Sequence, residues 1–183
     1  MKGVQEDPRA LFVRRWGEMA ASWGVGRTMA EIHALLYLAQ EPLCTDDVMH
    51  QLSVSRGSAS ANLRELVKWG LVHRVHQRGD RKEYFVAETN VWSMFETITR
   101  ERRRREVEPI VETIHRCLAI LESRTETRSP HDKQDADNCR ARLAEMLEFF
   151  MLMNGAFNML IGAGPDGLRQ FVPLGTDSTG MPR

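Results

Sequence analysis

Residues 52–70 read "LSVSRGSASANLRELVKWG", the pattern of an amphipathic helix whose opening turns are made of small residues. At about 100° per residue, the apolar side chains fall on one side and should pack inward: Ala59, Leu63, Leu66 and Val67. The other side and its flanks carry small, polar and charged residues: Arg56, Gly57, Ser58, Ser60, Ala61, Asn62, Arg64, Glu65 and Lys68. Ser55 can cap the start of this helix, and Gly70 can end it.

Two charge placements on this helix are unfavourable in isolation. Arg56 lies at the N-terminus, where the helix dipole disfavours a cation by roughly a few tenths of a kcal/mol. Arg64 and Lys68 are like charges four residues apart, which carries a similar small penalty. Both penalties disappear if phosphates lie nearby. The small residues would also let the helix backbone approach the floor of a DNA groove, where serine and asparagine side chains can reach base edges. The alternative is an ordinary solvated surface.

The neighbouring segments favour the first interpretation. Upstream, Thr45 can cap a short helix over residues 46–52. Downstream, strand-like residues 71–75 and 83–86 flank the glycine-containing segment 77–82, which predicts a hairpin with an exposed tip. A short helix, a turn, a second helix and a hairpin make a helix-turn-helix with a wing. The tip carries three cations that would release counterions from a phosphate backbone: Arg78, Arg81 and Lys82.

Asp80, also in this tip, has the wrong charge for a phosphate contact. We therefore expect it to tie down the wing or one of its arginines. The second helix would enter the major groove, while the tip follows the DNA backbone or the minor groove.

The rest of the chain is mainly helical by its apolar spacing. We expect a helix over residues 8–23 and a second helix opened by a capping box at 28–31. A long helix is expected over 91–122, divided or kinked by Pro109. A polar linker at 125–133, a last helix over 135–161 and a loose tail from Gly164 should follow. The predicted fold class is mainly α with a small β-hairpin wing: a winged helix-turn-helix plus long dimerisation helices.

Two helices have more apolar surface than one chain is expected to cover. The second half of the long helix carries a coiled-coil seam: Val107, Val111, Ile114, Leu118 and Leu121. The last helix is apolar around most of its circumference from Met146 to Ile161. Either the rest of the chain wraps these surfaces or a second copy covers them, and we expect a homodimer.

Charge and composition agree with a cytoplasmic nucleic-acid-binding protein. The net charge is zero, but residues 54–106 hold 12 Lys+Arg against 7 Asp+Glu, a local +5 that suits a polyanion-binding surface. Three scattered cysteines indicate reduced thiols. The most apolar run, residues 149–164, is shorter than the ~20 residues of a membrane span, so we expect no membrane partner.

The segments "SRGSASANLRELVKWGLV" and "RGDRKEYF" resemble the MarR-type winged-helix transcriptional regulators, and more closely their GbsR-like branch. The resemblance covers roughly residues 12–122. It implies a homodimer held by N- and C-terminal helices, with recognition helices in successive major grooves of a near-palindromic site. It also implies DNA contact for a set of positions here: Ser55, Arg56, Gly57, Ser58, Ser60, Asn62, Arg64, Arg78 and Arg81.

Because the branch responds to choline-like cations, the resemblance also raises an aromatic cage for a quaternary ammonium effector. The candidate residues are aromatic and lie near the expected domain junction: Trp16, Trp23, Trp92 and Phe95. Aromatic residues at helical spacing are more often part of a core, and that alternative stays open.

Three further features bear on function. Arg102–Arg105 cover all sides of a helix, so they are either a solvated segment paired with Glu101 and Glu106 or a supplementary phosphate contact. Cys44 is either a small buried side chain or a redox-sensitive thiol at a helix start. His73 and His76 lie on opposite faces of a strand, and no zinc-ligand spacing occurs. We expect no metal, no cofactor and no catalytic residue.

The resulting prediction is a sequence-specific, double-stranded-DNA-binding transcriptional regulator, an effector-responsive repressor acting as a homodimer. The alternative is a protein-interaction module on a winged-helix scaffold. The expected segments are 1–26 for packing and dimerisation, 27–89 for DNA binding, 90–162 for dimerisation and 163–183 as a flexible tail.

Overall fold

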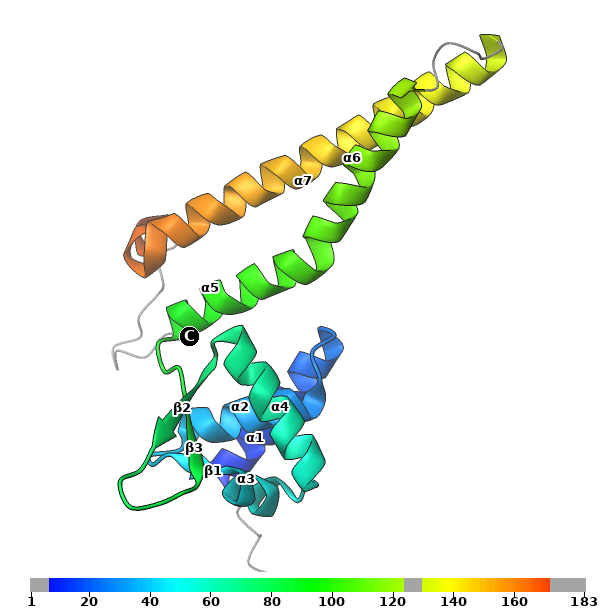
Figure 1. Ribbon diagram of the computed structural model, residues 1–183. Coiled ribbons are helices and arrows are strands. Elements are labelled where there is room, and N and C mark those ends of the chain that lie inside the picture. The colour runs from blue at the N-terminus through cyan, green and yellow to red at the C-terminus, as the bar shows by residue number, and fades with distance from the viewer. Residues whose placement is uncertain (1–6, 124–129, 172–183) are drawn as a thin grey trace, which may run out of the picture. The chain divides into compact units, whose positions relative to one another are not determined.

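The computed structural model describes residues 7–123 and 130–171 (Figure 1). Its elements, in chain order, are α1 (Pro8–Ser22), α2 (Arg27–Leu38), β1 (Leu43–Cys44), α3 (Thr45–Leu52), α4 (Arg56–Trp69), β2 (Val72–His76), β3 (Glu83–Ala87), α5 (Val91–Arg102), a π-helical turn η1 (Arg103–Val107), α6 (Glu108–Ser123) and α7 (Pro130–Phe171). Two compact units divide inside α5, between Ile98 and Thr99. The predicted fold class is confirmed, whereas the predicted segment boundaries stay predictions.

The core of the first unit lies between α2, α3, α4 and the sheet. Its fully buried side chains are Ile32, Val48, Leu63, Leu66 and Val72. Ala59 is also fully buried, and Val67 packs against the same cluster. The inward face predicted for residues 56–69 is therefore confirmed. Because burial of one side fixes how a helix is rotated, the small and cationic side of α4 must face away from the core.

The sheet of the first unit has three antiparallel strands in the order β1-β3-β2. The predicted hairpin is confirmed: β2 pairs with β3 from Val72 opposite Ala87 to His76 opposite Glu83. The third strand, β1, pairs Leu43 with Phe85. The sequence does not indicate it, because two residues are too few to show alternation. This strand joins the start of α3 to β3 of the wing.

Two predicted helix starts are wrong. α2 begins at Arg27 after Gly26, without a side-chain cap, and Glu31 binds the Arg27 guanidinium at 2.8 Å instead of completing a capping box. α3 is capped at Cys44 rather than Thr45, because the Asp47 carboxylate accepts the Cys44 backbone N–H at 2.8 Å. Cys44 itself is buried, as the structural interpretation of this cysteine expected.

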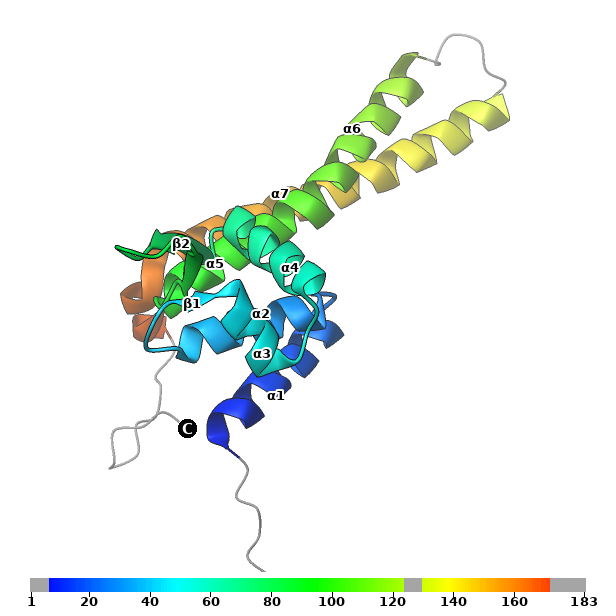
Figure 2. The same cartoon turned by 60° about the horizontal axis from the view of Figure 1, so that its bottom comes forward.

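The predicted division of the long helix at Pro109 is confirmed. Proline has no N–H and its ring crowds the carbonyl four residues earlier, so a regular α-helix cannot continue through it. The chain responds with the π-helical turn of residues 103–107, where the Glu108 N–H donates to the Arg103 carbonyl. α6 then continues and packs beside α7 within the second unit (Figures 1 and 2).

α7 is longer than the helix predicted from the sequence. It runs from Pro130 to Phe171, with a break at Gly164, whose φ of 63° is left-handed, just before Pro165. The predicted linker at 125–133 therefore ends earlier, and the predicted tail begins later. Residues 124–129 and 172–183 lie outside the described residues, so most of these two predicted segments does too.

The surface of α7 is unusually apolar. Among its exposed side chains are Met146, Phe149, Met151, Leu152, Met153, Phe157 and Met159. By length and composition alone the helix could cross a membrane. The expectation from residues 149–164 that this part of the chain is too short to cross a membrane is therefore wrong. Those are only the most apolar residues of a longer helix. A single helix of this kind is weak evidence for a membrane, since helices at subunit interfaces have the same composition.

Candidate nucleic-acid interface

Both ends of α4 are fixed by the residues that the sequence indicated. Ser55 Oγ accepts the Ser58 N–H at 3.2 Å. Gly70 adopts a left-handed φ of 79° at the other end and donates its N–H to the carbonyls of Leu66 and Val67. Only glycine takes this conformation without strain. The helix is thus held at a defined length, with its N-terminal turns outside the core.

The outer side of α4 is open to solvent. Arg56, Gly57, Ala61, Arg64 and Lys68 are exposed, as is the cap Ser55, while Ser58, Ser60 and Asn62 are half-buried. The Asn62 side-chain amide donates to the Ser58 carbonyl at 2.8 Å, which leaves its oxygen available for an external donor. The predicted contact face of α4 is therefore a continuous, accessible surface of small, polar and cationic groups.

Gly57 has no internal reason to be glycine. A Cβ built at this position meets no heavy atom within 4 Å, and the residue is the second of α4. Glycine in a backbone conformation that alanine can also adopt lowers stability by roughly 0.4–1 kcal/mol relative to alanine, mainly because the unfolded chain has more freedom. Neither packing nor backbone geometry within the described residues explains this loss, which favours clearance for an external partner.

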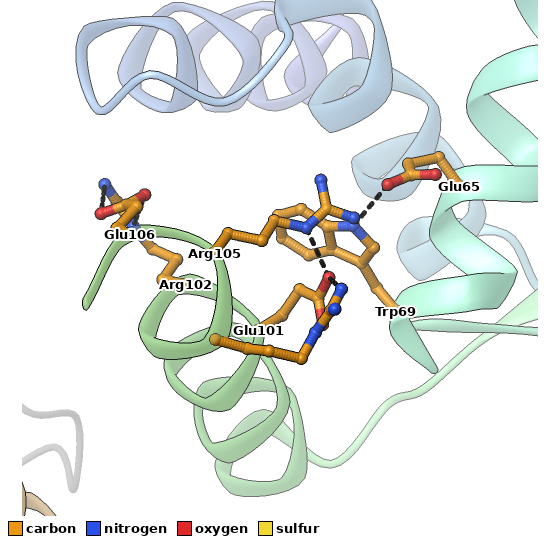
Figure 3. A network of polar contacts seen from close by, with 7 residues as sticks. Glu65, Trp69, Glu101, Arg102, Arg105 and Glu106 are labelled. Atoms are coloured by element: carbon orange, nitrogen blue, oxygen red, sulfur yellow. Dashed lines mark hydrogen bonds and ion pairs between the residues drawn. The ribbon is translucent and has the colours of Figure 1, made fainter. Parts of the chain in front are cut away.

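Glu65 does not contribute a free negative charge to this surface. Its carboxylate accepts a hydrogen bond from the Trp69 indole at 3.0 Å, one turn further along α4 (Figure 3). The single acidic side chain among the outward residues is thus tied to the C-terminal end of the helix, away from the small residues of its first turns.

The wing is held rigid by Asp80. One carboxylate oxygen accepts the Lys82 N–H at 3.0 Å, and the other accepts the Tyr84 hydroxyl at 2.8 Å. These hydrogen bonds lower the pKa of Asp80, and the bond to Asp80 raises the pKa of Tyr84 to about 12. Gly79 supplies the left-handed φ of 92° for the turn. The predicted structural role of Asp80 is confirmed, with backbone and tyrosine as its partners.

The cations of the wing tip are exposed: Arg78, Arg81 and Lys82. The tip and the outer side of α4 belong to the same compact unit. Within residues 7–98, Arg64, Lys68, Arg78 and Arg81 make no ion pair. Their charge is therefore available to an anionic partner.

Asp46, in the first turn of α3, contacts both the start of α4 and the wing, and the sequence alone did not indicate this role. Its Oδ1 accepts from Arg56 Nη2 at 2.5 Å, and its Oδ2 lies 3.4 Å from Lys82 Nζ. This carboxylate offsets the unfavourable position of Arg56 at a helix N-terminus within the chain itself, so nearby phosphates are not needed to remove that penalty. Its sequence signal was weak, because the partners lie 10 and 36 residues away.

The arginine cluster of the second unit is arranged differently. Arg104 and Arg105 both bind Glu101, and Arg102 binds Glu106 at 3.0 Å (Figure 3). Arg103 Nη1 donates to the side-chain oxygens of Asn154 at 2.7 Å and Asn158 at 3.3 Å. The hydrogen bond from Arg104, followed by that from Arg105, lowers the pKa of Glu101 to about 2. The predicted local partners, Glu101 and Glu106, are confirmed.

Three of the four aromatic residues predicted to bind an effector lie in two separate ring contacts in the first unit. Trp16 stacks on Phe12, with ring centroids 5.5 Å apart, and Trp92 contacts Phe95 at 5.3 Å. Trp23 is 63% exposed. No ring contact among the described residues links these groups. The aromatic cage stays a prediction.

The second unit contains a mostly apolar cavity of about 480 Å³ between the end of α5, the π-helical turn and α7. Aromatic side chains of α7 form much of its wall: Phe149, Phe150 and Phe157. The polar contact of Arg103 with Asn154 and Asn158 lies in the same lining. Sequence analysis did not indicate this cavity, because its residues are about 50 positions apart.

In the first unit, a helix-turn-helix is followed by a cationic wing, with the outer side of the second helix open. This arrangement defines the winged helix-turn-helix class. Residues 23–83 match the MarR family. The chain is also homologous to the HTH-type transcriptional repressor GbsR of Bacillus subtilis (strain 168), at 26% identity over 64% of this chain and 64% of that protein.

Two further similarities concern a second Bacillus protein and a solved structure. The putative HTH-type transcriptional regulator YvaV of the same bacterium is 20% identical over 52% of this chain and 58% of its own length. A crystal structure described as a transcriptional regulator matches the fold with a TM-score of 0.54 and 23% identity, covering 84% of this chain and 99% of that one. The resemblance seen in the sequence is thus confirmed, although the chain spans less than two thirds of the length of these two Bacillus relatives.

Proposed function

We propose that the protein is a MarR-type transcriptional regulator that binds double-stranded DNA with α4 and the wing, without catalytic activity. The observation that carries this proposal is the accessible outer side of α4, where small residues and unpaired cations lie in the same compact unit as a cationic wing tip. The homology to GbsR, a repressor, supports a role in repression.

In the proposed complex, the N-terminal turns of α4 enter the major groove. Gly57 and Ala61 allow close approach, Ser58, Ser60 and Asn62 reach base edges, and Arg64 and Lys68 bind flanking phosphates. Ser55 and Arg56 lie at the helix start beside the DNA backbone. The wing cations Arg78, Arg81 and Lys82 add phosphate contacts whose strength falls with salt.

The proposal includes a homodimer in the cytoplasm. The apolar side of α7 is exposed in the single chain, and contiguous exposed apolar surface marks a protein or membrane interface. A second copy covers this face and places two recognition helices on the two halves of a near-palindromic site. Light scattering should give a mass near twice 21.0 kDa in detergent-free buffer. A monomer at micromolar concentration, or recovery only with membranes, contradicts this part of the proposal.

Leu152→Asp tests the same face directly. Leu152 is 67% exposed in the single chain, so a carboxylate there leaves the fold of one chain intact. In a dimer interface the same carboxylate is buried without a partner. The variant should be monomeric, with an unchanged helical circular-dichroism spectrum and weaker DNA binding.

An effector would act by changing the spacing of the two recognition helices. An effector that binds one of the two arrangements a few kcal/mol more tightly than the other is sufficient to switch the protein between them. The cavity in the second unit has a volume in the range of small-molecule sites. Three of its lining residues, Phe149, Met153 and Phe157, also belong to the exposed face of α7, so a second copy there would close the cavity.

The deciding experiment is selection of bound duplexes from a randomised DNA pool, followed by affinity measurements at low and moderate salt. A DNA-binding regulator enriches one near-palindromic sequence and loses affinity steeply as salt rises. A protein-interaction module, the other candidate, would enrich no sequence and show no such salt dependence.

A further inference from the structure

One carboxylate connects the two DNA-facing parts of the first unit. Asp46 uses Oδ1 for the Arg56 guanidinium at the start of α4 and Oδ2 for the Lys82 ammonium in the wing, at 2.5 Å and 3.4 Å. The hydrogen bond that the Lys82 ammonium donates to Asp46 is the main cause of the raised pKa of Lys82. Asp46 is 46% exposed, and its two partners are 68% and 55% exposed. The pairs therefore lie at the proposed DNA surface, where an incoming phosphate can compete for both cations.

We propose that Asp46 is a specificity-determining residue for DNA binding. It positions Arg56 and Lys82 and opposes duplexes that offer phosphates alone. The inference rests on the proposed function, because it requires that α4 and the wing bind DNA. It adds a residue of α3, outside the recognition helix and the wing, to those that determine sequence selectivity.

On a non-cognate duplex, Asp46 weakens binding. Contacts there are mostly to phosphates, so Arg56 and Lys82 must leave the carboxylate or share it with a phosphate. If they leave, an unpaired negative charge remains beside the DNA backbone. The unpaired Asp46 carboxylate repels the phosphates and so lowers the affinity. It also takes up a cation from solution, so the number of counterions released on binding falls.

On the cognate duplex, the same carboxylate is helpful. An unpaired arginine side chain has many rotamers, and ordering them on binding reduces affinity. Asp46 holds Arg56 in one position before DNA arrives. Its own position is fixed, because the neighbouring Asp47 binds the Cys44 N–H and the following Val48 is fully buried. The wing is fixed in turn by Asp80. Selectivity by opposing the wrong partner as well as by favouring the right one is general in recognition.

The test compares Asp46→Asn with Asp137→Asn in the full-length protein. Asp137 is an exposed carboxylate of α7 that pairs with Arg140 at 2.9 Å, so its substitution changes the net charge equally, and it belongs to the other compact unit, not to the one that carries α4 and the wing. The probes are two fluorescent duplexes of equal length and composition: the best binder selected by the unsubstituted protein, and a shuffled version of it. Affinity is measured by anisotropy across a salt series.

We expect Asp46→Asn to bind the shuffled duplex about tenfold more tightly and the selected duplex within about threefold of the unsubstituted protein, so that the affinity ratio falls. The salt slope on the shuffled duplex should steepen by about one, the amount of one additional phosphate contact. Asp46→Glu keeps the charge and should restore most of the ratio. In an Arg56→Ala, Lys82→Ala background, Asp46→Asn should change the ratio little, because the cations through which it acts are absent.

The possible results distinguish failure of the proposed function from failure of the inference about Asp46. If the unsubstituted protein shows no salt-dependent DNA binding, the proposed function fails. If it binds DNA but Asp46→Asn and Asp137→Asn have equal ratios and slopes, the inference about Asp46 fails while the function stands. The inference about Asp46 is also overturned if Asp46→Asn loses binding to both duplexes while its thermal unfolding midpoint is unchanged. The carboxylate would then be needed for all binding.

Discussion

The two basic regions of this protein differ in how their charge is compensated. Arg102–Arg105 form the densest run of cations in the sequence, yet each one binds a carboxylate or an amide of the second unit. The cations of α4 and the wing are more scattered. Among the described residues, Arg56 and Lys82 pair with Asp46, and Arg74 of β2 pairs with Glu83 of β3, whereas Arg64, Lys68, Arg78 and Arg81 make no ion pair within residues 7–98.

This difference shows that charge density along a sequence is a poor guide to an anion-binding surface. A phosphate responds to the local field, and a carboxylate at hydrogen-bond distance cancels most of the field of its arginine. The sparse region in the first unit therefore has more charge available to an anionic partner than the dense region in the second.

The strongest test of this comparison is one arginine from each region. Arg64→Ala removes an unpaired cation from the centre of the proposed interface and should weaken binding of the selected duplex by about 10- to 100-fold, as expected for a base or phosphate contact. Arg104→Ala, its matched control, removes a cation already bound to Glu101 and should stay within about twofold. Equal losses in the two variants, measured by anisotropy, would refute the comparison.

The wing should contribute affinity but little selectivity. Arg78→Ala with Arg81→Ala removes two exposed cations without touching the Asp80 contacts that hold the hairpin. Because each lost phosphate contact lowers the salt slope by about 0.9, we expect a slope reduced by nearly two. Affinity should fall about tenfold on the selected and shuffled duplexes alike. A loss confined to the selected duplex would instead show that the tip reads sequence.

Gly57 provides a test in which stability and binding move in opposite directions. Gly57→Ala should stabilise the free protein by roughly 0.4–1 kcal/mol, since the new methyl meets no atom of the chain. The same methyl stands between α4 and a groove floor, so affinity for the selected duplex should fall several-fold. Urea unfolding and anisotropy measure the two effects. A variant that is both more stable and unchanged in binding would mean that α4 does not approach a surface at this point.

Much of the first unit could be predicted from local sequence. The spacing of Ala59, Leu63 and Leu66 sets the orientation of α4, and Ser55 and Gly70 set its ends. These features depend on residues within a few positions of one another. The contact of Asp46 with Arg56 and Lys82 could not be predicted in this way, because it depends on the packing of α3 against α4 and on the place of the wing.

The second unit was harder to predict for a related reason. Pro109 indicated a division of the long helix, but a π-helical turn is one of several ways to accommodate a proline. The helix predicted over residues 135–161 is shorter than α7 at both ends, because the polar residues 125–133 and the glycine at 164 have the local pattern of helix ends. The cavity is lined by the end of α5, the π-helical turn and α7, whose residues are about 50 positions apart, so no local pattern encodes it.

The smallest predicted effect tests the dense region by removing its compensation. Glu101→Gln releases Arg104 and Arg105 from their shared carboxylate, so affinity for the shuffled duplex should rise about twofold and the salt slope should steepen slightly. The folded pKa of Glu101, about 2, lies below its ordinary value of 4.5. Its ion pairs therefore stabilise the fold above that ordinary value, and this stabilisation is lost as pH falls towards 2. Urea unfolding between pH 6 and pH 3 should show the stability difference between the unsubstituted protein and Glu101→Gln shrinking on acidification. A constant difference would mean that Glu101 does not neutralise these arginines, and the contrast between the two basic regions would no longer hold.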